Sequence, residues 1–159
     1  MYLQSFFVLT LCASAAFCDL RTGKISNAFI LAGIGTGVCL SLSGTVLAAG
    51  KGASLLFPSI FPAPALLRLP ECLLGTAIPL ILGFPLFHIR ALGAGDIKLL
   101  MAVGSLIGSR SILPFLAASV LCGSAVAIPL LIAGWGLKGR FHFSVPILMA
   151  AMLYSAGLL

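Results

Sequence analysis

Long apolar runs, separated by short breaks that hold most of the charged residues, dominate this sequence. Lys, Arg, Asp and Glu make up only 8% of the 159 residues, whereas 61% are hydrophobic. A soluble domain has about 25% charged residues, so this chain has too few charges to cover a water-exposed surface. Its apolar content also excludes a disordered chain. Because the runs are continuously apolar, the sequence predicts an all-α fold, a polytopic bundle of membrane helices.

The charged breaks divide the chain into about six spans of roughly 20 residues. We predict these spans at residues 2–18, 27–49, 71–89, 97–107, 112–137 and 144–159. We expect the first to be a span and not a cleaved signal peptide, because no Lys or Arg precedes it. Residues 54–70 are apolar but hold four prolines, so we expect a loop or an interfacial segment there. Residues 1–159 form one membrane-embedded domain in this interpretation.

The basic residues give the chain a net charge of +6, but they occur singly or in pairs between apolar runs. This pattern indicates membrane topology and contact with anionic lipid, and we expect no nucleic-acid partner. The breaks after the first, third and fifth predicted spans lie on one side of the membrane, and this side receives six of the nine basic residues: Arg21, Lys24, Arg90, Lys98, Lys138 and Arg140. We therefore predict that this side faces the cytoplasm.

Metal or disulfide chemistry has little support in the sequence. The five cysteines are widely spaced, without a CxxC pair, and mostly lie inside apolar runs, as small buried side chains do. His88 and His142 fall on the same side as two of the acids, but they are isolated and no His-Glu-x-x-His motif exists. We expect neither a metal nor a cofactor.

Only three acidic residues occur, Asp19, Glu71 and Asp96, and each is costly near a bilayer. Two predicted crossings separate Asp19 from Asp96, so both lie on the same side of the membrane, and Glu71 lies on the other. Two carboxylates that meet in a site of low dielectric share a proton. One can then activate water as a general base while the other polarises a carbonyl as a general acid, which is the chemistry of aspartic proteases.

Two other interpretations of these acids stay open at this point. Asp96 can be a helix cap and Asp19 a turn residue, without any catalytic role. Alternatively, the pair can bind a proton or cation in a small transporter or channel component. Ion pathways place acids near the membrane midplane, whereas both aspartates fall at span ends beside basic breaks, so the sequence favours the protease.

The residues around the two acids resemble a known family. Gly93-Ala94-Gly95-Asp96-Ile97-Lys98-Leu99 resembles the GxGD signature of the type IV prepilin peptidases, and its glycines let the backbone pass close to a substrate. The segment from Asp19 to Asn27 resembles that family's first-aspartate segment, although Ser26 stands where the family often has proline. The lack of paired CxxC motifs and the length lead us to expect the short form without an N-methyltransferase domain, similar to the tight-adherence (Flp-type) peptidases.

This resemblance implies an aspartic endopeptidase, with Asp19 and Asp96 as its catalytic pair and Gly93 and Gly95 close to the substrate backbone. It implies a prepilin substrate with a basic leader and a hydrophobic helix, cut at the cytoplasmic face of the bacterial cytoplasmic membrane. A pseudo-enzyme that only scaffolds pilus assembly is a third possibility. We expect supporting roles for Lys98 and Asn27, strand-like pairing of residues 90–95 with the substrate, and contact with membrane lipid; the sequence leaves the oligomeric state open.

Overall fold

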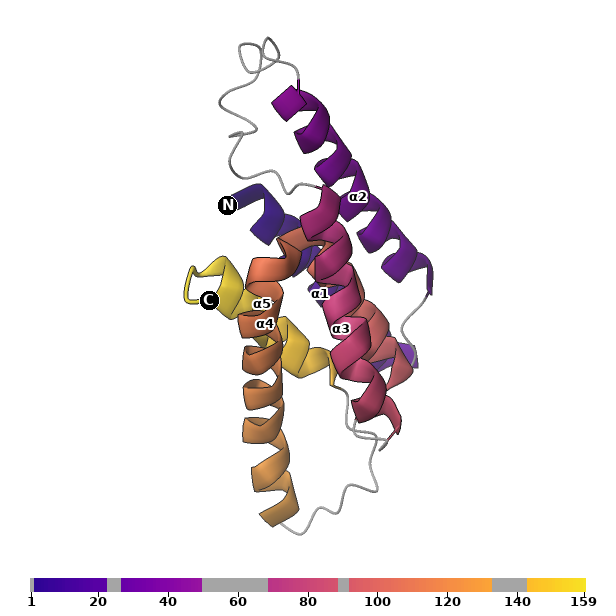
Figure 1. Cartoon of the computed structure of the whole chain (residues 1–159). Helices are drawn as coiled ribbons and strands as arrows, with labels where there is room; N and C mark the ends of the chain where they lie inside the picture. The colour runs from indigo at the N-terminus through magenta and orange to yellow at the C-terminus, as the bar shows by residue number, and fades with distance from the viewer. Residues whose placement is uncertain (1, 23–26, 50–68, 89–91, 133–142) are drawn as a thin grey trace.

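The structure, a computed structural model, describes residues 2–22, 27–49, 69–88, 92–132 and 143–159. The regular elements in these ranges are all helices, which confirms the predicted all-α fold (Figure 1). They are α1 (Tyr2–Thr22), α2 (Asn27–Ala49), α3 (Leu69–His88), α4 (Ala94–Ile132) and α5 (Ser144–Ser155).

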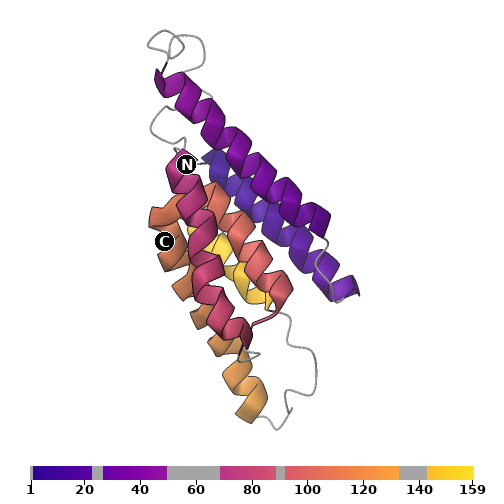
Figure 2. The same ribbon diagram turned by 45° about the vertical axis from the view of Figure 1, so that its right-hand side comes forward.

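Helix α4 turns back on itself at Gly108, so it consists of two arms, residues 94–107 and 109–132 (Figures 1 and 2). Gly108 has φ 79° and ψ 175°, a backbone conformation open essentially only to glycine. The break agrees with the predicted boundary between the spans 97–107 and 112–137. With α4 counted as two arms, successive helical segments run in alternate directions along the bundle.

Length and composition support a membrane protein. Among the described residues, three helical stretches are long and apolar enough to cross a bilayer: Gln4–Thr22, Leu69–His88 and Ala94–Pro129, the last of which includes the reversal at Gly108. The described side chains of α2, Asn27–Ser43, and those of α5, Ser144–Ser155, form two shorter apolar stretches. Large apolar side chains on the outer faces, such as Ile81, Phe84 and Leu121, are exposed, as suits contact with hydrocarbon.

Several predicted boundaries differ from the observed ones by a few residues; α4, for example, begins at Ala94 and α5 ends at Ser155. Helix α1 continues to Thr22, so Asp19 lies in its last turn and not in a polar loop. Local contacts support this last turn: the Thr22 hydroxyl donates to the Cys18 carbonyl at 2.8 Å, and the Arg21 guanidinium lies 4.6 Å from the centre of the Phe17 ring. Helix α3 begins at Leu69, before the predicted position, because a proline is tolerated in a first helical turn. The rest of the expected interfacial segment lies outside the described residues.

The first arm of α4 is the centre of the bundle, and residues 102–108 are all buried. Helix α3 crosses it where Gly75 meets Gly104; a Cβ on either would collide with the other's carbonyl oxygen. Small residues also form the α2 contact, where Gly33 lies against Ala102 and Gly37 against Ser105. Because these residues have little or no side chain, the helix backbones approach closely and gain dispersion contacts.

Helix α5 closes the bundle by packing on α1 and on α4. Near its start, the Phe143 ring lies against Gly123 of the second arm of α4. Near its end, the rings of Tyr154 and Phe115 meet edge to face, with centroids 6.4 Å apart. The start of α5 lies at the same end of the bundle as the end of α1.

The α3–α4 crossing gives a direct test of the packing. We expect Gly75→Ala to lower the free energy of unfolding by about 1–3 kcal/mol, because the new methyl group must push α3 away from the Gly104 carbonyl. The matched control is Gly35→Ala, since Gly35 is helical with open space around its Cβ position, and alanine is the better helix former. Thermal unfolding of both variants in detergent measures the difference. Equal stability of the two would contradict the crossing.

Candidate active site

Asp19 and Asp96 lie at the same end of the bundle, in the last turn of α1 and the first turn of α4 (Figure 2). Leu11 of α1 and Ala102 of α4 both lie against Gly33, which marks one level in the bundle. From this level, Asp19 is eight residues along α1 and Asp96 six residues back along α4, or about 12 and 9 Å at 1.5 Å per residue. The two acids are thus at nearly the same depth, on helices that contact each other.

The Asp19 carboxylate is buried, with 8% of the residue exposed. Its Oδ2 accepts a hydrogen bond of 2.6 Å from the Ser144 hydroxyl, which is fully buried at the start of α5. The sequence analysis did not select Ser144. A signal was present, because two predicted crossings separate it from Asp96 and place this hydroxyl at the same end of the bundle as both acids.

The Asp96 carboxylate folds back on the start of its own helix. Its Oδ2 accepts a 3.3 Å hydrogen bond from the Gly93 N–H, while the Gly93 carbonyl accepts from the N–H groups of Asp96 and Ile97 at 3.1 and 3.2 Å. This reciprocal arrangement resembles a capping box, in which a side chain in the first turn satisfies the N-cap amide. The expected capping contact of Asp96 therefore exists, although its residue lies inside the helix.

Gly93 has a structural reason to lack a side chain, since a Cβ there would lie 2.9 Å from the Asp96 Oδ2. Ala94 and Gly95 are already helical because α4 begins directly after Gly93. The expectation that residues 90–95 pair with substrate as a strand is therefore wrong for these two residues. Whether the glycines approach a substrate backbone stays a prediction.

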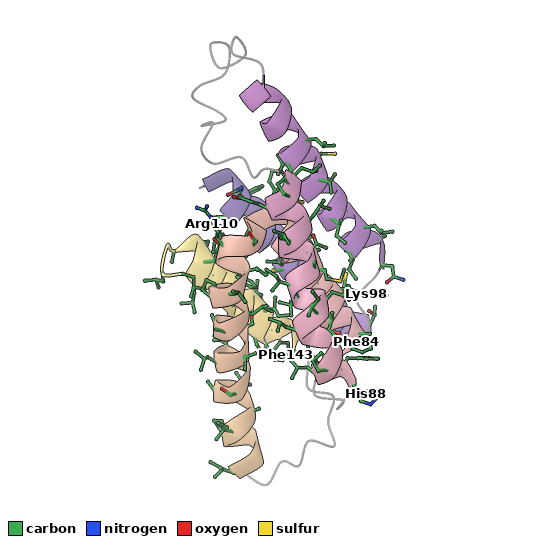
Figure 3. All side chains as sticks on the ribbon, viewed as in Figure 1. Phe84, His88, Lys98, Arg110 and Phe143 are labelled. Carbon is green, nitrogen blue, oxygen red and sulfur yellow. The ribbon has the colours of Figure 1, made fainter. Side chains whose placement is uncertain are left out.

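The two residues predicted to support the site, Lys98 and Asn27, contact each other. The Lys98 ammonium donates to the Asn27 Oδ1 at 3.2 Å, on the exposed surface where α2 begins (Figure 3). This contact joins the first residue of α2 to the first turns of α4. The Lys98 side chain therefore points to α2. This agrees with its position two residues after Asp96, because helical residues two positions apart point in different directions.

The third acid lies apart from the aspartates, and the described histidine is exposed. Glu71 lies in the first turn of α3, at the opposite end of the bundle, as the crossing count predicted. His88 is exposed in the last turn of α3 (Figure 3), and His142 lies outside the described residues. Over the ranges that the structure describes, no three His, Cys, Asp or Glu residues gather in a way that holds a metal.

The Lys98–Asn27 hydrogen bond can be tested by a double-mutant cycle. Because both side chains are exposed, we expect Lys98→Met and Asn27→Ala to cost about 0.5–1 kcal/mol each in the free energy of unfolding. The double variant should cost no more than the larger single change, since either substitution removes the same bond. Unfolding of the four proteins in detergent gives the coupling, and fully additive costs would show that the contact contributes nothing.

A model of the type IV leader peptidase family matches residues 6–128, which is more than half of the chain. The matched region contains Asp19, Asn27, Gly93, Asp96 and Lys98, whereas Ser144 lies beyond it. No curated protein and no solved structure shows a significant match. Because the family model covers four of the five helices and both helix ends that hold the acids, the chain belongs to the type IV leader peptidase family and is a peptidase with helices of membrane-spanning length.

Proposed function

We propose that this protein is an aspartic endopeptidase that removes the leader from type IV, Flp-like prepilins, with Asp19 and Asp96 as its catalytic pair. One observation carries the proposal: within the region matched to the peptidase family, the two acids lie in terminal turns of two contacting helices, at the same end of the bundle. Both acids lie in terminal helical turns, which supports peptide hydrolysis over the ion-pathway alternative, since an ion pathway places its acids near the midplane.

The proposed chemistry needs one ionised and one protonated carboxyl group. The ionised aspartate removes a proton from water, and the resulting nucleophile attacks the scissile carbonyl carbon. The protonated aspartate donates a hydrogen bond to the carbonyl oxygen and stabilises the charge that develops there. When the tetrahedral intermediate collapses, the leaving amine takes a proton from the pair, and the two acids return to sharing one proton. This scheme uses no metal or cofactor.

The surroundings of the site fit a substrate with a basic leader and a hydrophobic helix. The exposed apolar outer faces of the bundle allow a substrate helix to lie beside it in the bilayer. The two carboxylates lie at a bundle end, where a positively charged leader leaves the membrane. Charge asymmetry supports the cytoplasmic face of the bacterial cytoplasmic membrane for this end. The backbone at the cleavage point must be extended, because a helix holds its carbonyls in hydrogen bonds.

Removal of the acids tests the proposal. We expect Asp19→Asn and Asp96→Asn each to lower leader removal by at least about a thousandfold, because the amide keeps the size but cannot transfer the proton. Glu71→Gln is the matched control, since Glu71 lies at the opposite end of the bundle. The measurement is co-expression with a prepilin from the same genome, followed by the mass of the pilin. Cleavage by either Asp variant would exclude the paired mechanism.

The Gly93 contact predicts a second, smaller effect. A methyl group at this position must displace the Asp96 carboxylate, so we expect Gly93→Ala to lower the cleavage rate about tenfold or more. Gly35→Ala should cleave at the wild-type rate, because its new methyl group enters open space away from both acids. Initial rates with purified protein in detergent measure both variants. A wild-type rate for Gly93→Ala would show that the position of the Asp96 side chain in this structure is not the catalytic one.

A further inference from the structure

A hydroxyl from the last helix holds the Asp19 carboxylate. Ser144 Oγ lies 2.6 Å from Asp19 Oδ2, a distance within the range of charge-assisted O–H···O bonds. Both residues are buried, with 0% and 8% of their surface exposed. Ser144 lies outside residues 6–128, the region that matches the peptidase family, so that match assigns it no role.

The helix ends around Asp19 explain why its carboxylate benefits from this hydrogen bond. Asp19 lies in the last turn of α1, where the negative end of the helix dipole disfavours a carboxylate. Helix α5 begins at Ser144, so its positive end meets the same carboxylate. The hydroxyl and this helix end therefore act in the same direction, and both counter the unfavourable field of α1.

Two basic groups among the described residues contact other side chains. On α1, the Arg21 guanidinium lies over the Phe17 ring, and on α4 the Lys98 ammonium donates to Asn27. The described parts of α2 and α5 contain no Lys, Arg, His, Asp or Glu. The contact that α5 makes with this buried carboxylate is therefore a polar but uncharged donor, the Ser144 hydroxyl.

We propose that Ser144 is a positioning residue for catalysis, which fixes the orientation of the Asp19 carboxylate. Ser144 acts through Asp19 and does not itself touch the scissile bond. This inference rests on the proposed function, and it adds a residue of the last helix to the site. Removing the hydroxyl removes this hydrogen bond and loosens its hold on the orientation of the carboxylate, and orientation is what the reaction needs.

The test compares purified wild-type protein with three variants in detergent. Cleavage of a purified Flp-type prepilin is followed by mass, with initial rates that separate kcat from KM. We expect Ser144→Ala to lower kcat about 10- to 100-fold with KM within about twofold, and Ser144→Thr to keep kcat within about threefold. Ser119→Ala is the matched control, because Ser119 is equally buried but donates only to Phe115 of its own helix. Its rate should equal that of the wild type.

Each outcome decides the inference. A wild-type kcat for Ser144→Ala overturns it, and so does a Thr variant that is as slow as the Ala variant. A loss of activity that matches the loss of folded protein in thermal unfolding also overturns it, because the role is then structural. If the wild type does not cut the prepilin, the proposed function fails and the inference fails with it; cleavage by the wild type together with an unaffected Ser144→Ala overturns the inference alone.

Discussion

The close approach of helix backbones to the first arm of α4 is the contact on which the rest of the structure depends. Gly104 of this arm meets Gly75 of α3, and Ala102 and Ser105 meet the glycines of α2. In a bilayer, apolar side chains gain little by leaving lipid, so association depends on dense packing between small residues. Contacts with α2 and α3 thereby fix the position of this arm, and they also fix the position of Asp96 in its first turn.

The placement of two acids in terminal helical turns is the second constraint, and the fold meets it with hydrogen-bond donors at helix ends. The Asp96 carboxylate accepts from the Gly93 amide at the start of its own helix. The Asp19 carboxylate is at the unfavourable end of its helix and accepts from the Ser144 hydroxyl of another helix. The two acids are therefore supported in different ways, one by a backbone amide of its own helix and the other by a side-chain hydroxyl of a different helix.

Much of this arrangement could be predicted from the sequence, because hydropathy and crossing parity are strong signals in a membrane protein. The helices, the break near Gly108 and the common end of Asp19 and Asp96 all follow from the apolar runs and the charged breaks between them. The extension of α1 to Thr22 could not be predicted, because polar residues at the end of an apolar run predict a loop even where they are helical. Ser144 was missed because the crossing count places its hydroxyl at the same end as both acids but does not identify its partner, which the structure shows to be Asp19.

The first arm of α4 is short compared with the thickness of a membrane. Residues 94–107 are 14 residues, or about 21 Å of helix, which is shorter than the roughly 30 Å of a bilayer's hydrocarbon core. At least one end of this arm therefore lies below the membrane surface. Asp19, at nearly the depth of Asp96, lies about one turn inside the end of α1. A pair of acids in terminal helical turns favours a substrate bond just outside a membrane helix, where the chain is no longer helical and water can enter.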